Sequence, residues 1–170
     1  MGHMNLDDIQ NGSLCVVDTN ILLYAEQGLS AQAQRLLRRC STGELIGILP
    51  QTVWQELTHR LMLAEAMMLG KIAGPNPARQ LAQKADIVRS LSIYMEKIVA
   101  LQDLGLGFEA CKKEDFLGGL EMQNKYGLLI KDAILLNIAF RIKADVIVSN
   151  NTIFHTIGQI TNASPSDIAL

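Results

Sequence analysis

The chain has 170 residues, of which 49% are hydrophobic and 19% are charged, and its formal net charge is −2 at pH 7. This profile is typical of a soluble globular domain with its own core, and the overall charge gives no attraction for nucleic acid. No apolar run reaches the roughly 20 residues of a membrane helix. No basic segment followed by an apolar one opens the chain, so we expect neither a membrane span nor a signal peptide.

Cysteine usage favours a reducing compartment. The three cysteines, Cys15, Cys40 and Cys111, follow no metal-binding spacing. Cys15 lies in an apolar run and is expected to be a small buried hydrophobic residue. An odd set of thiols of this kind indicates a cytoplasmic location. The first four residues, MGHM, resemble a tag left by an expression vector.

The N-terminal part alternates strands and helices. The continuous apolar run at 14–17 predicts a strand buried on both faces, and it ends abruptly at Asp18. A helix follows, for which Asn20 is a candidate N-cap. A second helix is predicted over 30–40 and a short strand within 43–50.

The middle of the chain is predicted to be mostly helical. Residues 51–69 carry apolar side chains at helical spacing. The turn cluster GKIAGPNP separates them from a second long helix, predicted over 77–104. The two helices are expected to form an extended pair. We therefore predict one domain over 5–170, with a helical insertion at about 61–112.

The C-terminal part returns to helices and a strand. A helix that begins near Lys113 is expected to stop at Gly127, and another covers about 131–143. A buried strand follows within 144–150, whereas the last ten residues have too weak a pattern to assign. This alternation predicts an α/β fold with a parallel sheet. In such sheets ligands bind beyond the carboxyl ends of the strands, so polar residues there are the first candidates for a site.

Three carboxylates are expected to meet at that edge of the sheet. Asp18 follows the first strand, Glu56 lies early in the helix after the second strand, and Asp132 begins the helix before the last strand. Apolar neighbours indicate that each one faces inward, where a carboxylate needs a cation or hydrogen-bond donors. Oxygen ligands suit Mg²⁺ or Mn²⁺, and such an ion can activate water for phosphodiester hydrolysis.

The motifs VVDTNILLYA, VWQELTHRL and YGLLIKDAILLNIAFRIKADVIVSNNTIF occur in that order. Together they resemble the PIN-domain family, and especially the VapC-like ribonuclease toxins of bacterial toxin–antitoxin pairs. The resemblance implies a three-layer α/β/α sandwich with a central parallel sheet and Mg²⁺- or Mn²⁺-dependent endoribonuclease activity on RNA. It also implies a homodimer and an antitoxin partner.

Residue by residue, the resemblance assigns metal binding and catalysis to Asp18, Glu56 and Asp132. It gives supporting roles to three neutral residues that would orient substrate, water or ligands: Asn20, Ser149 and Asn151.

Two departures from the family pattern leave alternatives open. The family usually has an acid at the position of Asn151 and often another at the position of Ile153. A neutral amide is a poorer partner for Mg²⁺ than a carboxylate. The chain is therefore either a working metal-dependent endoribonuclease or a PIN-fold module that binds RNA or protein with weakened catalysis. The long interval between Glu56 and Asp132 supplies extra helical surface for a dimer, an antitoxin or RNA.

Simpler interpretations exist for the same residues. Asp18 and Asn20 suit helix capping, and Asp132 suits the first turn of a helix. His59 follows Glu56 by three residues but does not form the zinc motif H-E-x-x-H, so an ordinary histidine is favoured. A strand that ends in Asp-Thr-Asn also resembles haloacid-dehalogenase phosphatases, but Asn20 stands where those enzymes have their second acid.

Overall fold

The computed structural model describes residues 3–169, and within them six strands form one sheet. All neighbouring pairs are parallel, in the order β1-β6-β5-β2-β3-β4. The strand order reverses between β2 and β5, because the chain moves outward from β2 to β4 and then returns to β5 on the other side. The strands are β1 (Met4–Asn5), β2 (Leu14–Val17), β3 (Ile46–Pro50), β4 (Gly107–Glu109), β5 (Val146–Val148) and β6 (Thr161–Ser164).

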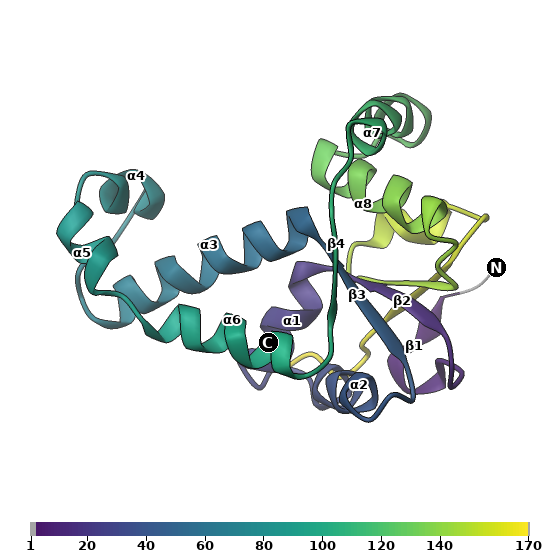
Figure 1. Ribbon diagram of the computed structural model, residues 1–170, viewed down its shortest axis with the longest axis horizontal. Helices are drawn as coiled ribbons and strands as arrows, with labels where there is room; N and C mark the ends of the chain where they lie inside the picture. The colour runs from purple at the N-terminus through teal and green to yellow at the C-terminus, as the bar shows by residue number, and fades with distance from the viewer. Residues whose placement is uncertain (1–2, 170) are drawn as a thin grey trace.

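Helices cover both faces of the sheet (Figure 1). The α-helices are α1 (Thr19–Glu26), α2 (Ala31–Ser41), α3 (Gln51–Met68), α4 (Pro77–Ala82), α5 (Ala85–Ser90), α6 (Ile93–Asp103), α7 (Lys113–Tyr126) and α8 (Ile130–Arg141). Two 3-10 helices, Leu6–Asp8 and Thr152–Thr156, complete the set. The expected three-layer sandwich is confirmed. Within residues 3–169, no helix combines the length and apolar character needed to cross a membrane.

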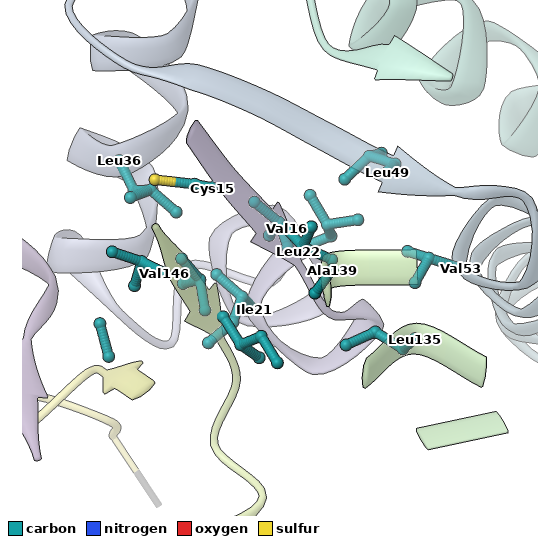
Figure 2. Close-up of a cluster of buried hydrophobic side chains, with 14 of the residues drawn as sticks. Cys15, Val16, Ile21, Leu22, Leu36, Leu49, Val53, Leu135, Ala139 and Val146 are labelled. Atoms are coloured by element: carbon teal, nitrogen blue, oxygen red, sulfur yellow. The ribbon is translucent and has the colours of Figure 1, made fainter. Parts of the chain in front are cut away.

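The core lies between β2 and the helices on its two faces. Cys15, Val16 and Val17 are all fully buried, as a central parallel strand requires. Figure 2 shows side chains from β3, β5, α1 and α8 gathered around Cys15 and Val16, and these side chains include Leu49, Val146, Ile21 and Leu135. This packing fixes the carboxyl end of β2, from which Asp18 follows.

The extended helical pair is present, but its second member is shorter than predicted. Helices α3 and α6 run side by side away from the sheet, with α4 and α5 at the far end (Figure 1). The prediction of one helix over 77–104 is wrong, because the segment divides into α4, α5 and α6. Leu81 and Leu91 turn inward to form a second small core with Ala66 and Ile72. Burial of these side chains outweighs the helix propensity of the segment.

A buried carboxylate fixes the start of α6. Glu65 of α3 accepts hydrogen bonds from the backbone N–H groups of Ser92, Ile93 and Tyr94, at 3.0, 3.2 and 2.9 Å. These are N–H groups that the first turn of a helix leaves without partners. Burial by itself would raise the pKa of Glu65, but the three backbone donors lower it below the usual value. The acid that interrupts the apolar face of α3 therefore holds the helical pair together.

Candidate functional site

The candidate site lies where the strand order reverses, at the carboxyl ends of β2 and β5. The backbone N–H of Asp18, directly after β2, donates to the carbonyl of Val148 in β5 at 2.9 Å. Ser149 follows β5 at the same edge, and its hydroxyl donates to Asp18 Oδ2 at 2.7 Å. This is the location that the parallel-sheet rule gives for a ligand.

Asp18 is almost fully buried and is held by four donors. Its Oδ1 accepts from the Thr19 N–H at 2.7 Å and lies 3.2 Å from Lys131 Nζ. Its Oδ2 accepts from Ser149 and, at 2.9 Å, from the Asn20 amide. Asp18 is therefore the N-cap of α1, and the prediction that Asn20 caps this helix is wrong. The cap falls at Asp18 because the backbone leaves β2 in an extended conformation at that residue and turns helical at Thr19.

Asn20, Ser149 and Asn151 form the neutral scaffold of the site. Asn20 Oδ1 accepts from the Asn150 N–H at 3.1 Å, which links the start of α1 to the loop after β5. The Ser149 hydroxyl accepts from the Asn151 N–H at 3.1 Å while it donates to Asp18. Asn20 and Ser149 both donate hydrogen bonds to the Asp18 carboxylate and so fix its orientation.

Glu56 reaches the site from the second turn of α3. Its Oε2 accepts from the Thr19 hydroxyl at 2.9 Å and from Lys131 Nζ at 2.7 Å. Arg60, one turn further along α3, lies 3.8 Å from Oε1. Partial burial would raise the pKa of Glu56, but Lys131 and Thr19 outweigh this effect and lower it. Glu56 is therefore an ionised carboxylate that contacts Thr19 and Lys131 at the end of the sheet.

Asp132 is the third acid, and Asn151 is bound to it. The Asn151 Nδ2 donates to Asp132 Oδ2 at 3.0 Å, while the Asn151 Oδ1 accepts from the Ile153 N–H at 3.2 Å. The amide oxygen is thus turned away from the acids and caps the 3-10 helix. Burial, together with the charges of Asp18 and Glu56, raises the pKa of Asp132. The site therefore carries a carboxylate that needs a nearby positive charge.

Lys131 is the charged residue of the candidate site that the sequence did not predict. Its Nζ lies 3.2 Å from Asp18 Oδ1, 2.7 Å from Glu56 Oε2 and 3.7 Å from Asp132 Oδ1. Burial lowers the pKa of the ammonium, but the acids raise it above the usual value, so Lys131 is charged. A signal was present in the sequence, since Lys131 is a single cation directly before Asp132 in the apolar run LLIKDAILL.

The chemistry of the donor set fits a hard divalent cation. Three carboxylates from three separate segments converge on one positive charge, and oxygen donors of this kind suit Mg²⁺ or Mn²⁺. In this structure the cation that they share is the Lys131 ammonium. Among residues 3–169, no group of three or more acidic, histidine or cysteine side chains is close enough to hold a metal ion.

Chains of two solved toxin–antitoxin complexes have a similar fold. A chain of the VapBC2 complex of Rickettsia felis, bound to a DNA fragment from its promoter, superposes with a TM-score of 0.55 at 15% identity, covering 89% of this chain and 98% of that chain. A chain of a toxin–antitoxin complex from Klebsiella pneumoniae gives 0.57 at 16% identity, covering 91% and 99%. No protein-family model matches the sequence, and no curated protein matches it.

These likenesses confirm the predicted α/β fold. The chain has the fold of VapC toxins, which are PIN-domain proteins, over about 90% of its length. At such low identity the similarity extends to the fold alone. The function must therefore be argued from the site itself.

Proposed function

We propose that this protein is a metal-dependent endoribonuclease of the toxin type, which hydrolyses phosphodiester bonds in RNA. The observation that carries the proposal is the convergence of Asp18, Glu56 and Asp132 at the reversal point of a PIN-type sheet. Their buried or half-buried carboxylates form a negative centre that suits a divalent cation. The toxin–antitoxin complexes that share the fold add support for the toxin class.

Each residue has a distinct part in this proposal. Asp18, Glu56 and Asp132 would hold Mg²⁺ or Mn²⁺. When bound, such an ion neutralises phosphate charge and lowers the pKa of a water that attacks phosphorus. Asn20 and Ser149 keep Asp18 oriented through their hydrogen bonds to Oδ2. Thr19 orients Glu56 through its hydroxyl. Because water would be the nucleophile, the site needs no protein nucleophile, and its chemistry would depend on how firmly the acids are positioned.

The proposal predicts cleavage of RNA that depends on a divalent ion and on Glu56. Purified protein should cleave a mixture of structured and unstructured RNAs with Mg²⁺ or Mn²⁺, and excess EDTA should stop the reaction. Glu56→Gln should lower the rate by about 100-fold, because it removes one of three anionic ligands while keeping the side chain's size. Glu121→Gln, on the exposed surface of α7, is the matched control and should keep the wild-type rate. Equal rates for both variants would refute the assignment of Glu56.

An antitoxin is the proposed protein partner. Helices α1, α2, α3 and α6 border an apolar groove of about 290 Å³, with Leu22, Leu37, Leu61 and Leu101 among its lining residues. Lys97 and Glu26, which form an ion pair, also line it. Such a groove suits an amphipathic segment of a partner. The homodimer also remains a proposal, supported by three partly exposed apolar residues on α7: Phe116, Leu117 and Leu120.

The second candidate is a PIN-fold binding module with weakened catalysis, and the Asn151–Asp132 hydrogen bond favours it. An acid at position 151 would place a fourth negative charge beside Asp132, whereas the amide instead donates a hydrogen bond to it. A site built this way has less charge with which to attract a divalent ion. RNA binding without metal-stimulated cleavage would support this candidate over the nuclease.

Asn151→Asp separates the two candidates. The new carboxylate would lie within about 3 Å of Asp132, so the variant should be less stable than wild type in EDTA because of repulsion between like charges. In Mn²⁺ it should recover stability, bind the ion about tenfold more tightly, and cleave RNA faster. Calorimetry and thermal unfolding with and without Mn²⁺ measure these effects. If the wild type is inactive but the variant cleaves, the module interpretation is correct and the scaffold is intact.

A further inference from the structure

The centre of the acid cluster already contains a cation, the ammonium of Lys131. Its Nζ lies within 3.7 Å of one carboxylate oxygen from each of Asp18, Glu56 and Asp132. Within the described residues 3–169, no other ammonium or guanidinium group contacts more than one of these three acids, since Arg60 reaches Glu56 alone. The acids and Lys131 therefore form one electrostatic unit.

The distances from Lys131 Nζ to the acids are longer than the bonds that a divalent ion makes to its ligands. The three N–O distances run from 2.7 to 3.7 Å, whereas Mg²⁺ holds its oxygen ligands at about 2.0–2.1 Å. A metal ion at this centre would draw the carboxylates inward and would lie too close to Nζ for both cations to stay. Like charges at such short range repel strongly in a partly buried site. The two cations are thus alternative occupants of one position.

The side chain of Lys131 is partly exposed to solvent at the edge of the acid cluster. It is 33% exposed, and it projects from the first turn of α8 on a flexible four-carbon stem. The ammonium can therefore move into solvent without a change in the backbone, while Asp132 on the same turn stays buried. The acids remain held in place by Thr19, Asn20, Ser149 and Asn151.

We propose that Lys131 is the resident counter-cation of the acid cluster, and that a divalent ion binds only by displacing its ammonium. This inference rests on the proposed function in taking the three acids as cation ligands. Lys131 stabilises the metal-free protein and at the same time lowers its apparent affinity for metal. The nuclease, as a consequence, is kept in a metal-free, inactive form until the divalent ion is concentrated enough to compete.

Calorimetric titration of Mn²⁺ tests the competition directly. Lys131→Met should bind Mn²⁺ about tenfold or more tightly than wild type, because the competing charge is gone and the stem length is kept. Lys131→Arg keeps the charge and should show no such gain. The control Lys113→Met, on the exposed start of α7, should match wild type. Equal or weaker binding by Lys131→Met, or no binding by any of the proteins, overturns the proposal.

A second measurement uses the unaltered protein, in case Lys131→Met fails to fold. Reductive methylation with formaldehyde and cyanoborohydride as the reductant, followed by mass spectrometry, reports how exposed each lysine amine is. Lys131 should be protected without Mg²⁺ and should react as fast as Lys113 once Mg²⁺ is bound. Continued protection of Lys131 at saturating Mg²⁺ overturns the proposal. If Lys131→Met binds Mn²⁺ more tightly but no RNA is cleaved, the proposed nuclease function is wrong and the inference about Lys131 stands. If wild type cleaves RNA but Lys131→Met does not bind Mn²⁺ more tightly, the nuclease function stands and the inference about Lys131 is wrong.

Discussion

Replacing Asp115 with Ala is expected to lower the free energy of unfolding by about 3 kcal/mol, although Asp115 lies outside the candidate site. Asp115 is fully buried in α7 and accepts two hydrogen bonds from the Arg141 guanidinium, each at 2.8 Å. Arg141 also donates to Glu109 of β4 at 2.7 Å. The substitution leaves a half-buried guanidinium without its main partner, and it removes the hydrogen bonds that join α7 to Arg141 of α8. Urea unfolding followed by circular dichroism measures the loss.

The loss should shrink in acid, which distinguishes the ion pair from simple packing. Burial raises the pKa of Asp115, but Arg141, the Lys112 N–H and Asn137 outweigh burial and lower it. A carboxyl with a lowered pKa stabilises the fold above its unfolded pKa, about 4, and that stability disappears as the pH falls through the folded pKa. Wild type should therefore approach Asp115→Ala in stability between about pH 5 and pH 2. Glu114→Ala, exposed on the same turn, is the control, with a change under about 0.5 kcal/mol at any pH.

The sequence predicted the parts of the fold whose signals are local. The buried apolar runs of β2 and β5, the helical spacing of α3 and the stop of α7 at Gly127, which has a φ of 70°, all appear where expected. The division of 77–104 did not, because it depends on Glu65 capping α6 from another helix. Strand β6, Thr161–Ser164, has no apolar run and exists through its parallel pairing with β5 and β1.

The meeting of the three acids at one edge of the sheet was predictable, but the cation between them was not. A parallel sheet brings the residues that follow its strands to one edge, so Asp18 and Ser149 were expected to lie together. In the structure the Ser149 hydroxyl oxygen lies 2.7 Å from Asp18 Oδ2. The contact of Lys131 with Asp18 and Glu56 depends on how the first turn of α8 faces the sheet. No spacing rule relates residue 131 to residues 18 and 56, which explains why a positive charge that partly offsets the three acids was not predicted.

Asp18→Asn is expected to have the largest effect on activity, with RNA cleavage lowered on the order of 1000-fold. Asp18 is the most buried of the three acids, with 1% of its surface exposed, and every polar neighbour of its carboxylate is a donor. An amide in its place has only one acceptor oxygen. Its NH₂ group must therefore face either the donors of Ser149 and Asn20 or the donors of Thr19 and Lys131. The substitution therefore removes a charge and also disturbs the residues that orient the site.

Two measurements separate these consequences. Calorimetry should show Mn²⁺ binding weakened beyond detection in Asp18→Asn, while circular dichroism shows the fold retained. Asp103→Asn, exposed at the end of α6, should match wild type in both respects. Glu56, with 29% of its side chain exposed, has water available to replace its lost contacts, so its substitution should cost less than that of Asp18. If the order were reversed, with Glu56 more important than Asp18, the centre of the chemistry would lie on α3 rather than at the carboxyl end of β2.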